Sequence, residues 1–169
     1  MFILFFVNLA AAVSYLLPIP MYPDVAVLHG FSETFIGFVF GFYSIATIVF
    51  IPYINKLIHY YGRINMLNVL IAIKMMSTLG FIAIFYIEDH FLFAIVSLLS
   101  RTIQGVCIEM INILDFSLAS LTAQPNQASN NLSIVEMGTS SGFVLGPLFA
   151  FLFGYSGYSV PFLATMVLD

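Results

Sequence analysis

The stretch from residue 91 to residue 116, FLFAIVSLLSRTIQGVCIEMINILDF, decides the fold class of this chain. A helix rises about 1.5 Å per residue and a membrane span needs about 20 mostly apolar residues, so the stretch can cross a bilayer as one helix. It nevertheless carries Arg101, Gln104 and Glu109, which are costly in contact with lipid. Polar groups at this depth face protein or a water-filled cavity. The stretch therefore predicts a membrane helix with one polar, functional face.

The composition of the whole chain also indicates a membrane protein. Hydrophobic residues make up 62% of the 169 positions and charged residues only 7%, whereas soluble domains carry about 25% charged residues. The mean hydropathy is +1.08. The four basic residues are scattered and the formal net charge is -4, which excludes a nucleic-acid-binding surface. Because the chain has one cysteine, Cys107, and no Cys/His cluster, it predicts no internal disulfide, metal site or cofactor.

Membrane spans are delimited by clusters of proline, glycine, asparagine and charged residues. The predicted N-terminal transmembrane bundle occupies residues 1–169, with spans at approximately 3–22, 34–55, 65–86, 91–116 and 132–153 and a partial span at 158–169. The first is interpreted as a span rather than a signal peptide, because no positive residue precedes its apolar run. Pro18, Pro20 and Pro23 are expected to break the outer end of this helix and end the span, and a gating bend is the alternative.

The charges between the spans predict the orientation of the chain. Lys56 and Arg63 fall between the second and third spans, whereas Glu88 and Asp89 fall between the third and fourth. Loops with basic residues normally stay in the cytoplasm, so the N-terminus is predicted to be cytoplasmic. The sequon that begins at Asn131 would then be cytoplasmic and carry no glycan.

The polar face of the fourth span is expected to line a cavity. At about 100° per residue, Gln104 and Gly105 flank the angular position of Arg101, and Glu109 lies about 80° away. Intramembrane charges are rare and are retained mainly for function, so we predict that Arg101 and Glu109 handle substrate or protons. The alternative is a structural ion pair that joins two helices.

Three further polar residues occur inside predicted spans. Glu136, about one turn inside the fifth span, would pair with Arg101 or exchange a proton, or else is simply solvated at the helix start. Asn8 would make a helix-packing hydrogen bond or face the same cavity. Lys74 would pair with a carboxylate or extend its stem to the membrane surface, and the sequence does not decide between these two.

The fifth span contains a stripe of small residues. Gly138, Gly142 and Gly146 recur every four residues and are followed by Pro147. Residues at this spacing share one helix face, so another helix can approach the stripe closely. The proline is expected to bend the outer half of the span.

These motifs, in this order, resemble the major facilitator superfamily. Its fourth-helix signature, Arg-x-x-Gln-Gly, is matched by Arg101, Gln104 and Gly105, and the resemblance implies a role for Arg101 in proton coupling. Its fifth-helix signature in proton antiporters, Gly-x-x-x-Gly-x-x-x-Gly-Pro, is matched from Gly138 to Pro147, although its closing Gly-Gly is replaced. The resemblance implies an all-α membrane protein that is the N-terminal six-helix half of this fold, with its sixth helix truncated.

A third motif of the family is only partly present. The loop signature Gly-x-x-x-Asp-Arg-x-Gly-Arg aligns with residues 55–63, where Gly62 and Arg63 are kept and His59 replaces the aspartate. In the family this loop helps to close the cytoplasmic side. The resemblance therefore implies a cytoplasmic gate of His59, Gly62 and Arg63, with Asp115 at the end of the fourth span as a partner of Arg63.

Short runs at residues 32–43 and 157–162, together with Glu136, are similar to the vesicular amine transporter branch and its polyamine-transporter-like members. This similarity implies proton-coupled antiport of an amine or other organic cation by alternating access, with a missing C-terminal half as partner. The alternatives are an uncoupled facilitator and a non-transporting scaffold or half-transporter. An enzyme is the least expected class, because the sequence has no nucleophile–base pair, HExxH motif or glycine-rich phosphate loop. The sequence leaves the plasma membrane and a vesicle membrane open.

Overall fold

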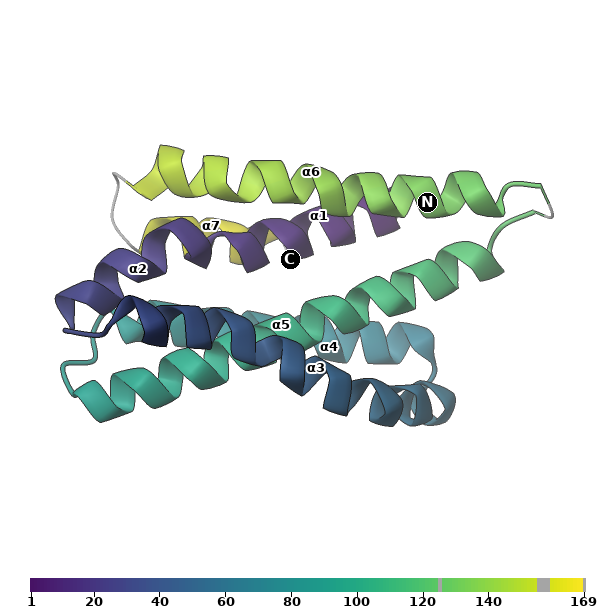
Figure 1. Ribbon diagram of the computed structural model, residues 1–169. Helices are drawn as coiled ribbons and strands as arrows, with labels where there is room; N and C mark the ends of the chain where they lie inside the picture. Colours follow the sequence, from purple (N-terminus) through teal and green to yellow (C-terminus); the bar gives the residue numbers. More distant parts are fainter. Residues whose placement is uncertain (125, 155–158, 169) are drawn as a thin grey trace.

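The computed structural model describes residues 1–124, 126–154 and 159–168 (Figure 1). In these residues the only regular secondary structure is helical, which confirms the all-α fold class. The helices are α1 (Phe2–Leu16), α2 (Pro18–Leu28), α3 (Glu33–Tyr61), α4 (Arg63–Ile84), α5 (His90–Leu121), α6 (Ala128–Gly154) and α7 (Ser159–Leu168). Five segments are long and apolar enough to span a membrane, with α1 and α2 together forming the first. The chain is a multi-pass membrane protein.

The first span continues beyond its prolines. The helix does break at the prolines, because α1 ends at Leu16 and α2 begins at Pro18. The prediction that they also end the span is wrong, because α2 runs on to Leu28. Pro18 and Pro20 lie in the first turn of α2, where the N–H groups have no partner within the helix and proline is tolerated. Only Pro23 lies deeper inside the helix. The prolines therefore interrupt the span without ending it.

The other helices differ from the predicted spans mainly at their ends. At the start of α3 the Ser32 hydroxyl accepts a hydrogen bond from the Phe35 N–H, and at the start of α5 the Asp89 carboxylate accepts one from the Leu92 N–H. Between α3 and α4, Gly62 has a φ of 78°, which favours glycine. The predicted partial span at 158–169 corresponds to α7, and its positions 158 and 169 lie outside the described residues.

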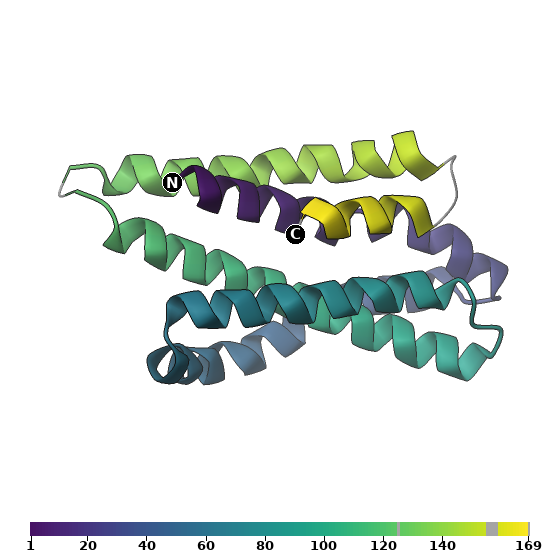
Figure 2. The same ribbon diagram turned by 180° about the vertical axis from the view of Figure 1, so that it is seen from behind.

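The helices pack as two neighbouring groups (Figures 1 and 2). In one group α1 lies along α6, with α7 beside them, and in the other α3 and α4 flank α5. The N-terminus, the α3–α4 turn and the α5–α6 connection lie at one end of the bundle, which we call the N-terminal end. The α2–α3 and α4–α5 turns lie at the opposite end. Lys56, His59 and Arg63 are thus near the N-terminal end.

The sequon provides a test of orientation. Asn131 lies at the N-terminal end, where its side-chain amide donates to the Ala119 carbonyl at 3.3 Å. We expect no glycan on Asn131 in a glycosylating host, because the basic residues keep this end in the cytoplasm. The substitution Gly30→Asn creates a sequon at the opposite end, at a positive-φ position that asparagine tolerates, and should add a glycan. Gel shifts after endoglycosidase treatment measure both, and glycan on Asn131 alone would reverse the orientation.

Candidate functional site

Arg101 lies in the middle of the bundle and has neutral partners. Its side chain is 1% exposed. Its Nη1 donates to the main-chain carbonyl of Tyr15 at 2.6 Å and to the side-chain oxygen of Gln104 at 3.0 Å. The guanidinium carbon lies 4.0 Å from the Tyr15 ring centroid, 4.8 Å from that of Phe40 and 6.0 Å from that of Tyr43. These contacts are in the range of cation–π interactions, so the charge is held by α1, α3 and α5 together.

Pro18 explains why a main-chain carbonyl of α1 is available to Gln104. In an α-helix the carbonyl of residue i accepts from the N–H of residue i+4, so the Ser14 carbonyl would be bonded by residue 18. Proline has no N–H. The Nε2 of Gln104, which is wholly buried, donates to the Ser14 carbonyl instead, at 3.0 Å. The break in the first span thus supplies an acceptor that α5 uses.

This explanation predicts a coupling between Gln104 and Pro18. In the native background Gln104→Leu leaves the buried Ser14 carbonyl without a donor, which should destabilise the chain by about 1–3 kcal/mol. In a Pro18→Ala background the new N–H can bond that carbonyl, so the same substitution should cost about 1 kcal/mol less. Unfolding of the four proteins in detergent gives the coupling energy. Equal costs in both backgrounds would contradict the role of Pro18.

Gly105 completes this group by allowing α3 to approach α5. A Cβ atom on Gly105 would lie 2.5 Å from the Tyr43 ring, which is closer than side chains pack. The Tyr43 ring in turn packs edge-on against the Tyr15 ring, with centroids 5.7 Å apart. The structure therefore brings Arg101, Gln104 and Gly105 together. We call Arg101 and Gln104, with Ser14, Tyr15, Phe40 and Tyr43, the arginine centre.

The carboxylates predicted to serve Arg101 are not beside it. Glu136 is exposed on α6, and Glu109 is half-buried about two turns farther along α5. Neither contacts the guanidinium, so the predicted pairing of Glu136 with Arg101 is not formed. The physical reason is that the Tyr15 carbonyl, the Gln104 amide and aromatic rings already surround the charge.

A second buried polar cluster joins α1, α5 and α6. The Asn8 amide nitrogen donates to Asp115 Oδ2 at 2.5 Å and to the Leu4 carbonyl at 2.9 Å. The Thr139 hydroxyl donates to the Asn8 amide oxygen at 3.3 Å. Asp115 is wholly buried and Asn8 is 1% exposed. Asn8 therefore makes a helix-packing hydrogen bond, about two turns from the α1 residues of the arginine centre.

The predicted pairing of Arg63 with Asp115 is wrong in this structure. Arg63 Nε donates to the Ser117 hydroxyl at 2.9 Å, and Asp115 bonds Asn8. Residues two apart on a helix point about 200° apart, so Ser117 faces α4 while Asp115 faces α1. His59 is exposed in the last turn of α3, next to the Gly62 turn.

The glycine stripe of α6 faces α1 along its length. A Cβ atom would lie 2.5 Å from the Phe5 carbonyl at Gly138, 2.9 Å from the Leu9 carbonyl at Gly142 and 2.8 Å from the Leu16 Cβ at Gly146. The absence of side chains is therefore what lets the two helices touch. Pro147 is exposed and off this contact, and α6 continues past it to Gly154.

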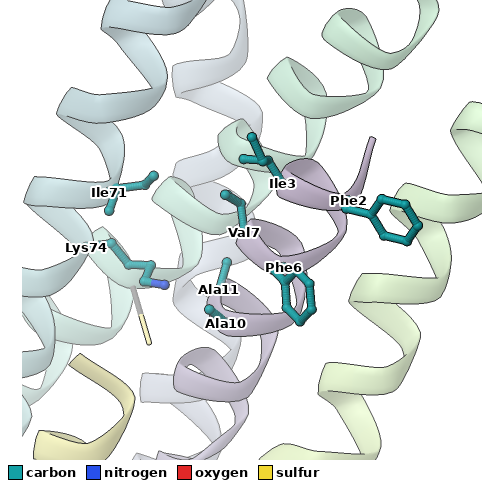
Figure 3. A pocket seen from close by; sticks show the side chains of 8 residues that line it. All are labelled: Phe2, Ile3, Phe6, Val7, Ala10, Ala11, Ile71 and Lys74. Atoms are coloured by element: carbon teal, nitrogen blue, oxygen red, sulfur yellow. The ribbon is translucent and has the colours of Figure 1, made fainter. Parts of the chain in front are cut away.

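A cavity of about 420 Å³ lies between α1 and α4, away from these clusters (Figure 3). Lys74 is buried there and its ammonium group points from α4 toward α1. The rest of the lining is apolar, with Ile71 from α4 and Phe2, Ile3, Phe6, Val7, Ala10 and Ala11 from α1. None of the residues predicted to couple protons lines this cavity.

Several residues of these sites were not predicted from the sequence. Phe40 and Tyr43 lie in the run at residues 32–43 but were given no role, and Thr139 lies in no motif, because the roles of all three depend on how neighbouring helices pack. The free acceptor on α1 could have been predicted, because Pro18 lies four residues after Ser14 and has no N–H to bond the Ser14 carbonyl. Helical periodicity could likewise have shown that Asp115 and Ser117 point to opposite sides of α5.

Comparison with known proteins agrees with this architecture. The family model described as Major Facilitator Superfamily matches residues 4–168. No curated protein and no solved structure matches the chain at a significant level. The family match covers nearly all of the chain, including α5 with its Arg-x-x-Gln-Gly motif and α6 with its glycine stripe. This chain belongs to the major facilitator superfamily, a family of membrane transporters.

Proposed function

We propose that the chain is part of a transporter that exchanges protons for an organic cation by alternating access. The observation that carries the proposal is the arginine centre, where one buried charge is held by three candidate spans at once. A change in the packing of α1 or α3 against α5 must break contacts to Arg101. The centre is therefore sensitive to the helix movements that alternating access requires.

The chemistry of the arginine centre supports an organic cation as substrate. The faces of Tyr15, Phe40 and Tyr43 surround a positive charge in this conformation. Aromatic faces attract cations through their quadrupoles, and organic ammonium ions bind to such faces. When Arg101 leaves, the same faces become available to a substrate cation. The short runs that resemble the vesicular amine branch are consistent with this substrate class.

Proton coupling requires a carboxyl group that is exposed alternately to water and to the protein interior. Glu109 is half-buried on the same helix as Arg101, and Glu136 is exposed on α6 three residues before Thr139. We propose both as groups that exchange protons with water. In this proposal Arg101 influences them through helix movement rather than through a direct ion pair.

We also propose that a second half covers the exposed face of α3. Only 11% of the most apolar part of α3 is buried inside the bundle, against 50% for α5. Transporters of this class bind substrate between two repeats, and α3 would supply part of that interface. The proposal predicts six more apolar spans in the reading frame downstream of Asp169. A stop codon directly after Asp169 would contradict it.

Uptake of labelled tetraethylammonium into liposomes tests the function. The liposomes carry the chain, with the second half if the reading frame encodes one, and uptake is measured with and without an acidic interior. Exchange for protons predicts uptake that the outward proton gradient drives. Uptake independent of the gradient would indicate an uncoupled facilitator. No uptake of this cation or of a polyamine such as spermidine would indicate a non-transporting membrane protein.

A further inference from the structure

Asp115 stands out among the buried groups that the proposed function does not use. It lies 14 residues beyond Arg101 on α5, about 21 Å along the helix, toward the N-terminal end. Its carboxyl group is wholly buried. Oδ2 accepts the hydrogen bond from Asn8, whereas no described group donates to the buried Oδ1. One half of a carboxyl group is therefore enclosed by protein without a hydrogen-bond donor.

No described cation compensates a negative charge on Asp115. Its contact on α1 is the neutral Asn8, and the group on α6 that bonds Asn8 is the neutral Thr139. Of the two basic side chains on α4, Arg63 is bonded to Ser117, and Lys74 lies at the cavity between α1 and α4. The other titratable groups toward this end of the bundle do not contact Asp115: the amino group of Met1, the exposed Lys56 and His59 of α3, the exposed Glu136 of α6, and the half-buried Glu109 of α5 itself.

We propose that Asp115 is a proton-binding site, neutral in the packed arrangement seen here. An ionised carboxylate that is buried without a cation and with half of its acceptors unused is strongly disfavoured, and such a group takes up a proton. A hydronium ion donates the proton, so that one of its O–H bonds breaks, an O–H bond forms at the carboxylate, and a water molecule is left. The reverse step returns the proton to water.

The hydrogen bonds of Asn8 determine which oxygen carries the proton. The Asn8 amide nitrogen also donates to the Leu4 carbonyl, and its amide oxygen accepts from Thr139. The group that faces Asp115 is therefore an N–H donor in either protonation state. Oδ2 stays an acceptor, and the proton is on Oδ1.

The glycine stripe controls access of water to this site. A Cβ on Gly138 would lie 3.3 Å from the Asn8 Cβ and 2.5 Å from the Phe5 carbonyl, so α6 lies directly over the Asn8 side chain. Movement of α6 away from α1 breaks the Thr139–Asn8 bond and admits water to Asp115, which then releases its proton. This inference rests on the proposed function and deepens it: Asp115 is the buried carboxyl group that would hold the coupled proton, and Glu109 and Glu136 keep the role of groups that exchange protons with water.

Infrared spectroscopy of the full chain in lipid measures the protonation directly, without transport. We expect a carbonyl band of a protonated carboxylic acid at neutral pH that shifts when aspartate is labelled with carbon-13. The labelling needs no substitution and separates aspartate from glutamate. The band should disappear in Asp115→Asn, change frequency in Asn8→Ala, and persist in the control Asp24→Asn, because Asp24 is exposed. A spectrum without a labelled, protonated aspartate would overturn the proposal.

The uptake assay separates this inference from the proposed function. If Asp115 carries the coupled proton, Asp115→Asn should take up cation equally with and without the gradient, while Asp24→Asn keeps the gradient dependence. Gradient-driven uptake in Asp115→Asn would overturn Asp115 as the carrier and leave the exchanger intact. A protonated Asp115 in a protein without gradient-driven uptake of any cation would contradict the proposed function and support the proton site alone.

Discussion

Gradient-driven uptake should fall at least about tenfold when Arg101 is replaced by alanine. Hydrogen bonds from a charged donor contribute about 1.5–3 kcal/mol each and a desolvated cation–π contact about 2 kcal/mol, whereas a tenfold effect needs only about 1.4 kcal/mol. The substitution removes the bonds to the Tyr15 carbonyl and to Gln104 and the stacking on aromatic rings. The arrangement of α1, α3 and α5 around the centre is then lost.

The variant Arg101→Lys is the matched control for charge. Lysine keeps the positive charge but lacks the planar guanidinium that bonds and stacks at the same time. We expect its uptake to lie between that of the native protein and that of Arg101→Ala. Thermal unfolding of all three proteins checks that each is folded. Unchanged gradient-driven uptake in folded Arg101→Ala would remove Arg101 from the mechanism.

The second large effect is expected from Gly142→Leu. A side chain there would collide with the Ala12 side chain and with the Leu9 carbonyl, and a main-chain atom cannot rotate away. Overpacking of this kind costs about 1–3 kcal/mol, and a leucine against a helix backbone should reach the upper end or exceed it. We therefore expect α1 and α6 to separate, with a clear drop in the unfolding temperature in detergent.

The control is the same substitution on α3, Gly41→Leu. Gly41 is exposed and a Cβ there would meet nothing within 4 Å. Leucine is also the better helix former, so with residues 1–169 as the only protein in the detergent this variant should unfold near the native temperature. An equal loss of stability in both variants would show that the glycine stripe has no special packing role.

The sequence predicted the α5 residues of the arginine centre better than their partners on α1 and α3. Helical spacing was enough to place Gln104 beside Arg101, because both lie on α5 within one turn. The partners from α1 and α3 depend on how the helices pack, which spacing within one helix cannot reveal. Glu136 and Arg63 show the same limit, since each was assigned a partner by charge alone and lies elsewhere in the structure.

The starts of α3 and α5 can be read from cap residues in the sequence. Ser32 and Asp89 are typical N-cap residues, and α3 and α5 begin directly after them. The prolines were expected to end the first span, but two of the three occupy the first turn of α2, where they cost little. Their effect is chemical as well as geometric, because Pro18 leaves the Ser14 carbonyl for Gln104.

In the proposed mechanism, the two centres along α5 have different functions. The arginine centre holds the Arg101 cation among aromatic rings. Asp115, near the N-terminal end, is the carboxyl group that we propose as the proton-binding site. Both contact α1, which also carries the glycine contact with α6. A movement of α1 against its neighbours would therefore act on both centres at once, which is the coupling that an exchanger needs.

The most direct test of exchange is to record protons and cation in the same vesicles. A pH-sensitive dye is enclosed in the liposomes, and tetraethylammonium or spermidine is added outside. The account predicts that the interior becomes more alkaline as the cation enters, because protons leave in return, and that Arg101→Ala abolishes both signals. Entry of the cation with no change in internal pH would contradict it.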